Sequence, residues 1–94
     1  MVAWYCVKEE QFSLEAGEPA EFEGTSGARR QFCPRCGTGL FYRNAQSLPG
    51  LVDIQAATFD DPAVAPSAQV QCAERLAWVD ELSQIPEFER YPQP

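Results

Sequence analysis

The sequence contains no histidine, and this absence removes several kinds of chemistry from the 94-residue chain. A Ser-His-Asp triad, a Cys-His pair and any general base built on an imidazole all need a histidine side chain. Histidine metal ligands are excluded as well. A metal site in this chain must therefore use cysteine, carboxylate, water or groups from another molecule.

Basic residues and long apolar runs are also scarce. Seven lysines and arginines stand against 14 aspartates and glutamates, which gives a formal net charge of −7. Because an acidic chain does not neutralise phosphates or bind an anionic bilayer, we expect neither nucleic acid nor membrane as a partner. No apolar run has the length of a membrane helix, and the first residues lack the basic segment of a signal peptide. We therefore expect a cytoplasmic protein.

What the sequence does contain is typical of one small, mainly β domain. Hydrophobic residues make up 45% of the chain, but a chain this short buries a modest core and benefits from a metal, a crosslink or a partner. Residues 68–79 alternate weakly and predict a strand, although 73–79 can also form a helix. Other stretches rich in β-branched and aromatic residues predict strands between Gly/Pro turns at residues 2–7, 20–23, 31–32, 40–42 and 51–58.

The most informative motif is FCPRCG, residues 32–37, where Cys33 and Cys36 stand two residues apart. A glycine after the second cysteine allows a tight turn, so that backbone amides can point at the thiolates, as in a zinc-knuckle hairpin. A knuckle supplies two of the four tetrahedral zinc ligands. The flanking apolar residues Phe32, Leu40 and Phe41 are expected to pack this hairpin on the core.

Other interpretations of the cysteines stay open. A redox pair sits at a helix N-terminus, but the residues TGLFY that follow Cys36 are a poor helix start. Two inert thiols in a turn are a further possibility. Cys6 and Cys72 stand alone in apolar stretches, which is typical of buried free cysteines. Convergence of all four cysteines on one site, or a Cys6–Cys72 disulfide, is the less favoured alternative.

The blocks FCPRCGTGLFYR, LVDIQAATFDDPA and QVQCAERLAWVD resemble the glutathione-dependent formaldehyde-activating enzyme family, which includes centromere protein V. Residues 2–37 and the closing WVDELSQIPEFE are similar too. The resemblance implies a partial domain over residues 1–88 with a tail at 89–94. It implies small antiparallel sheets around zinc, called a β-tent, and carbon–sulfur lyase chemistry on adducts of formaldehyde and glutathione.

The resemblance also implies roles for the cysteines. Cys33 and Cys36 match the later half of the family's structural zinc site, whereas Cys6 and Cys72 match no family ligand. The family's Cys-x-Cys motif, and the Cys-x-Cys-x-x-Cys cluster of the zinc linked to catalysis, precede the region that matches Val2. The expectation is therefore the C-terminal part of the domain without the N-terminal cysteine motifs. Such a partial domain is expected either from a truncated or misassigned start, or from a short family member whose missing half comes from another chain.

Three expectations about partners follow. A second copy can supply another Cys33/Cys36 pair and cover apolar surface, so we expect a homo-oligomer. The residues expected at that surface are Val2, Trp4, Phe41 and Trp78. Arginines around the knuckle can meet the carboxylates of a glutathione-type small molecule, although charges that balance nearby acids are the simpler interpretation; they are Arg29, Arg30, Arg35 and Arg43.

Two functions therefore compete. The first is a zinc-binding relative of carbon–sulfur lyases that is impaired alone or depends on a partner for catalysis. The second is a non-catalytic zinc-binding structural or interaction domain.

Overall fold

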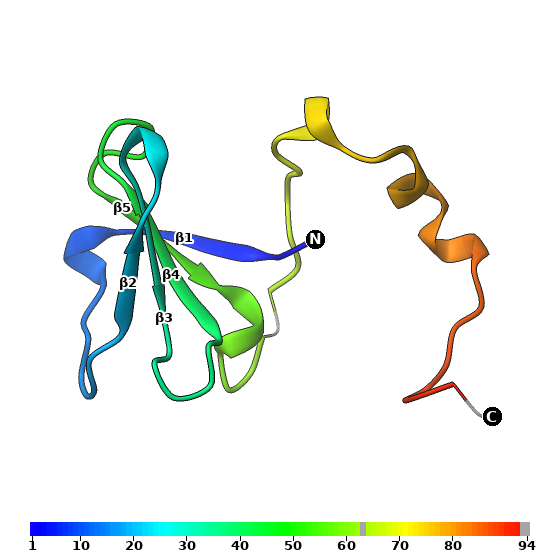
Figure 1. The fold of residues 1–94 in the computed structure, drawn as a ribbon, viewed down its shortest axis with the longest axis horizontal. Coiled ribbons are helices and arrows are strands. Elements are labelled where there is room, and N and C mark those ends of the chain that lie inside the picture. Colours follow the sequence, from blue (N-terminus) through cyan, green and yellow to red (C-terminus); the bar gives the residue numbers. More distant parts are fainter. Residues whose placement is uncertain (63, 93–94) are drawn as a thin grey trace.

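The computed structural model describes residues 1–62 and 64–92 and shows an antiparallel sheet followed by a long C-terminal segment (Figure 1). In this part of the chain five strands form one sheet in the order β1-β5-β4-β3-β2. The mainly β, antiparallel fold expected from the sequence is confirmed. The strands are β1 (Trp4–Lys8), β2 (Ala20–Glu23), β3 (Ala28–Phe32), β4 (Gly39–Asn44) and β5 (Leu51–Gln55).

Short 3-10 helices connect the strands and make up the regular structure of the C-terminal segment. They are η1 (Glu9–Gln11), η2 (Thr25–Gly27), η3 (Ala56–Thr58), η4 (Cys72–Glu74) and η5 (Ala77–Gln84). Strands β2 to β5 follow one another as neighbours, and β1 pairs with the outer side of β5. Hairpins therefore join β2 to β3, β3 to β4 and β4 to β5, whereas the connection from β1 to β2 spans the sheet from one edge to the other.

The expected strand over residues 68–79 is wrong, and the helical alternative for 73–79 is closer to the structure. Gln71 adopts a left-handed conformation with φ of 58°, which interrupts an extended chain just before η4. A strand also needs a neighbouring edge to bond its backbone, and Figure 1 shows this segment set apart from the sheet. The predicted strand over 51–58 likewise ends at Gln55, where η3 begins.

The core lies on one face of the sheet, which we call the packed face. Val52 is its fully buried residue, and it pairs with Val7 across β1 and β5. Residues outside the sheet cover this face: the ring of Phe12 meets Phe41 edge-on at 4.9 Å, and that of Phe59 meets Tyr5 at 5.6 Å. Phe41 was expected at an uncovered surface, and that expectation is wrong because Phe12 lies over it.

The opposite face, which we call the open face, has no aromatic ring packed over it from outside the sheet among the described residues. It is covered at its margins: Asn44 is buried and donates to the Ser26 carbonyl and the Tyr42 hydroxyl, and residues 64–67 lie beside Trp4. The register aligns one row of side chains across all five strands: Cys6, Asp53, Tyr42, Arg30 and Phe22. Trp4 lies on the same face, 6.5 Å from the Tyr42 ring. Trp4 is 38% exposed and Phe22 is 63% exposed. Val2 and Trp78 are also exposed, as expected from the sequence.

The molecule is extended for its size. Its accessible surface is 8148 Å², whereas a compact monomer of this mass exposes about 5,400 Å². Its radius of gyration is 15.9 Å, against about 12 Å for a compact domain of this length. The expectation of a modest core is confirmed, and much apolar surface stays open to solvent.

Arg43 of β4 binds Glu9 of η1 and so holds the connection after β1 against the middle of the sheet. Its guanidinium donates to both carboxylate oxygens of Glu9, at 2.9 and 3.1 Å, and to Gln31, and it lies over the Phe12 ring. The side chain is 16% exposed. We expect Arg43→Ala to lower the free energy of unfolding by about 2 kcal/mol, as judged by urea denaturation.

Arg29 provides the matched control for Arg43. It pairs with Glu21 at 2.8 Å, but its side chain is 47% exposed, so Arg29→Ala is expected to cost less than about 1 kcal/mol. Hydrogen bonds from Arg43 also lower the pKa of Glu9. The stabilisation from this pair is therefore present above the ordinary glutamate pKa and is lost as the pH falls through the lowered folded value. Equal losses for the two variants would contradict this role of Arg43.

Candidate metal centre

Cys33 and Cys36 lie in the turn that joins β3 to β4. The Cys33 amide donates to the Thr38 carbonyl and the Gly37 amide donates to the Cys33 carbonyl, each at 2.8 Å. These two bonds close the turn into a knuckle over residues 33–38. Gly37 has φ of +82°, a left-handed conformation that favours glycine. The glycine after the second cysteine therefore has the backbone role that the motif predicts.

The surroundings of Cys36 favour its thiolate form, which is the form that binds metal. Its Sγ lies 3.1 Å from the Thr38 Oγ1, and the side chain is exposed at the surface. The pKa of Cys36 is lowered, mainly by hydrogen bonds from the Thr38 hydroxyl and backbone and also by the Cys33 thiol. Sequence reasoning identified both cysteines but missed Thr38, although a threonine two residues after the second cysteine is a visible signal.

A structural zinc site takes four ligands from thiolate, imidazole or carboxylate groups. Cys33 and Cys36 are suitable donors, and Cys36 is accessible to a further molecule. Within residues 1–62 and 64–92, no three Cys, His, Asp or Glu side chains gather as a metal site. The knuckle therefore fits zinc as half of a ligand set, with two positions left for groups from elsewhere.

The other cysteines lie apart from the knuckle. Cys6 is in β1 on the open face, where burial and then the neighbouring Asp53 raise its pKa. Cys72 is in η4 of the C-terminal segment. All four cysteines are free thiols, so the Cys6–Cys72 disulfide that the sequence left open is not formed. The four cysteines also do not gather in one place among the described residues, so the four-cysteine site is not formed either. The chain after Cys36 continues into β4 and not into a helix, which argues against a redox pair.

Comparison with protein families identifies the fold. The family model of the glutathione-dependent formaldehyde-activating enzyme matches residues 1–74. The chain belongs to this family. The match includes all five strands and the knuckle, and it confirms the resemblance seen in the sequence. No curated protein matches the chain, and no solved structure matches it.

The formaldehyde-activating family match ends at residue 74, the last residue of η4. The domain limit expected at residue 88 stays a prediction. None of the helices in the described part of the chain is long and apolar enough to cross a bilayer.

Two of the four candidate arginines have structural roles. Arg29 and Arg43 form ion pairs with Glu21 and Glu9, in agreement with the simpler interpretation of charge balance. Arg30 instead lies over the Tyr42 ring at 4.9 Å, on the open face. Arg35 lies in the exposed turn of the knuckle between the two cysteines. Arg30 and Arg35 are therefore the members of the set without a carboxylate partner among the ion pairs of the described chain.

The opposite pKa shifts of Cys36 and Cys6 give a second testable prediction. In reduced, metal-free protein, we expect the rate of alkylation by iodoacetamide to reach its half-maximum at a lower pH for Cys36 than for Cys6. Peptide mass spectrometry after timed quenching measures both sites in one sample. Thr38→Val should move the Cys36 midpoint upward and leave Cys6 unchanged; identical midpoints in the wild type would contradict the assignment.

Proposed function

We propose that this chain is a zinc-binding member of the formaldehyde-activating family that shares one zinc ion between two copies. The Cys33 and Cys36 thiolates of each copy supply two ligands, and two copies complete a tetrahedral set. The observation that carries this proposal is the closed knuckle, in which the exposed Cys36 sulfur is hydrogen-bonded by Thr38 at 3.1 Å. Two cysteine donors at this spacing suit zinc, which supports the proposal.

Membership of the family supports a proposal for the class of reaction. We propose that it is related to carbon–sulfur lyases acting on adducts of formaldehyde with a glutathione-type thiol. When bound, zinc in such an enzyme holds a thiolate sulfur and lowers the pKa of the thiol. A zinc ion already held by four thiolates has no open position, so this chain depends on a partner for catalysis.

The role of the chain's own residues is to bind the thiol compound. Arg35 stands between the two cysteines in the exposed turn of the knuckle and has no partner among the ion pairs of the described chain. Guanidinium groups bind carboxylates by paired hydrogen bonds, and glutathione carries two carboxylates. We propose that Arg35 holds one carboxylate of a glutathione-type ligand near the knuckle. We also propose that the protein works in the cytoplasm, where thiols stay reduced.

Glutathione titration tests this function and separates it from the second candidate, a non-catalytic interaction domain. We expect saturable amide shifts in two-dimensional NMR around residues 33–38, and at least about fivefold weaker binding in Arg35→Ala. Arg29→Ala is the control, because Glu21 already occupies that side chain. Absence of any saturable shift at millimolar glutathione would favour the non-catalytic domain.

A direct assay completes the test. Zinc-loaded protein mixed with glutathione and formaldehyde should form S-hydroxymethylglutathione at the spontaneous rate. Turnover above that background would show that the chain completes a catalytic site by itself and would contradict the partner dependence.

A further inference from the structure

The C-terminal segment carries apolar side chains at every third position. In a 3-10 helix residues three apart lie on the same side, because each turn contains three residues. Helix η5 has this geometry, with the Val79 amide bonded to the Leu76 carbonyl at 3.0 Å. The apolar spacing of three continues past the helix end, but Ile85 is already extended with φ of −90° and ψ of 155°, so the helical geometry aligns only Leu76, Val79 and Leu82. We call the six residues the tail stripe: Leu76, Val79, Leu82, Ile85, Phe88 and Tyr91.

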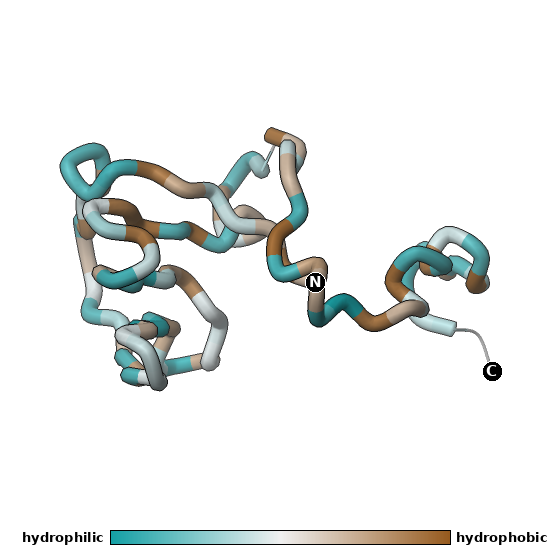
Figure 2. The backbone as a smooth tube through the Cα atoms, turned by 90° about the horizontal axis from the view of Figure 1, so that it is seen from above, coloured by the Kyte–Doolittle hydropathy of each residue, from teal (hydrophilic) through white to brown (hydrophobic). Residues whose placement is uncertain are grey.

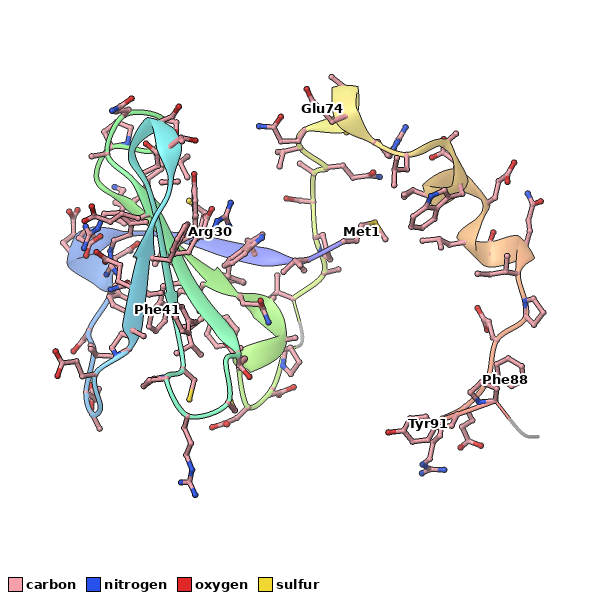
Figure 3. All side chains as sticks on the ribbon, in the orientation of Figure 1. Met1, Arg30, Phe41, Glu74, Phe88 and Tyr91 are labelled. Atoms are coloured by element: carbon pink, nitrogen blue, oxygen red, sulfur yellow. The ribbon has the colours of Figure 1, made fainter. Side chains whose placement is uncertain are left out.

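Four of the six tail-stripe residues are exposed to solvent, and Val79 and Leu82 are half-buried. Ile85 is 57% exposed, Phe88 is 55% exposed and Tyr91 is 81% exposed. Figures 1 and 3 show the segment set apart from the strands, and Figure 3 labels Phe88 and Tyr91 on it. Figure 2 shows its apolar residues interspersed with polar ones. Isolated 3-10 helices of eight residues are not stable in water. The segment therefore needs a surface on which to dock.

The open face of the sheet is complementary to this segment. It presents the aromatic rings of Trp4, Tyr42 and Phe22, together with the Arg30 guanidinium. The C-terminal segment is acidic, with five carboxylates against two arginines between residues 74 and 92. Glu81 and Glu87 lie outside the ion pairs that Arg75 and Arg90 form within this segment. The apolar side chains of the tail stripe can therefore pack on the rings of the open face, and the acidic side chains of the segment can pair with Arg30.

From these observations we propose that two copies of the chain exchange their C-terminal segments, so that the tail stripe of one copy docks on the open face of the other. Residues 64–67 still lie beside Trp4 and Cys6 of β1, and the chain that follows them leads the segment away from its own sheet (Figure 1), which favours docking on a second copy. The surface in excess of a compact monomer is about 2,700 Å² per chain, and a stable interface buries about 800 Å² on each side. Reciprocal exchange about a twofold axis forms two equivalent contacts in each dimer, and each contact buries one tail stripe against one open face.

Sedimentation velocity in reductant and chelator tests the exchange without any contribution from zinc. We expect the wild-type chain to be a dimer. We expect Leu82→Glu on the stripe and Phe22→Glu on the open face each to raise the dimer dissociation constant at least about tenfold. Ser83→Glu, next to the stripe, is the matched control and should leave the dimer unchanged.

Each remaining outcome overturns the exchange. A monomeric wild-type chain would show that the stripe folds back on its own sheet or serves another protein, and a dimer that tolerates both glutamate variants would place the contact elsewhere. A second measurement separates these cases. In a background with all four cysteines replaced by serine, a nitroxide at Ser83→Cys on one chain should broaden the Arg30 and Tyr42 amides of an isotope-labelled partner chain. Absence of this broadening in a dimer would also overturn the exchange, and none of these results depends on the zinc proposal.

Discussion

Replacing Cys33 and Cys36 together with serine is expected to abolish zinc binding. Zinc holds thiolates far more tightly than hydroxyls, and the pair is the only donor set that the knuckle provides. Structural zinc sites contribute about 10–16 kcal/mol of apparent binding free energy, so losing both thiolates should weaken zinc affinity by more than about a thousandfold. Competition with a chromophoric zinc chelator at constant pH measures this change.

The two remaining cysteines supply the control for this experiment. Cys6→Ser in β1 and Cys72→Ser in η4 remove thiols that lie outside the knuckle. Both variants should keep wild-type zinc affinity. A loss of zinc in either one, or retention of zinc by the double knuckle variant, would move the metal site away from residues 33–38.

Val52→Asp is expected to unfold the sheet at 25 °C. Val52 is fully buried in β5 and pairs with Val7 of β1. Burying a carboxylate without a partner costs several kcal/mol, which approaches the whole stability of a small domain, about 5 kcal/mol. The far-ultraviolet circular dichroism and the dispersion of amide resonances should both collapse to those of an unfolded chain.

Val70→Asp is the matched control, since Val70 is 83% exposed in the C-terminal segment. The same chemical change there should leave the spectra and the urea midpoint unchanged. If Val52→Asp folded with a wild-type midpoint, the core would not lie on the packed face as described.

The strands of this fold could be predicted from local sequence because their residues carry the signal themselves. Val52 and Ile54 alternate with polar residues in β5, and glycines mark the turns. The structure of the C-terminal segment could not be predicted in the same way. Weak alternation over residues 68–79 predicts a strand, but a strand forms only beside an edge that can bond it, and the sequence does not reveal that no edge is near. The covering of Phe41 by Phe12 depends likewise on tertiary packing.

The site could be predicted in its ligands but not in its surroundings. The Cys-x-x-Cys-Gly spacing predicts the knuckle, because glycine permits the left-handed turn at Gly37. The contact of Thr38 with the Cys36 sulfur is local to the turn, whereas the roles of Arg29 and Arg43 depend on which parts of the chain the sheet brings together. Pairing brings Glu21 opposite Gln31 and places Arg29 beside it, a proximity that no local pattern contains. Which arginines form ion pairs therefore depends on the sheet register and not on the local sequence.

Native mass spectrometry of zinc-loaded protein tests the central claim most directly. The account predicts a dimer that carries one zinc ion, about half a zinc per chain, because two knuckles together supply four thiolates. The zinc should disappear from the dimer when Cys33 and Cys36 are serine. A chain that binds no zinc, or a monomer that binds one zinc by itself, would contradict the shared site.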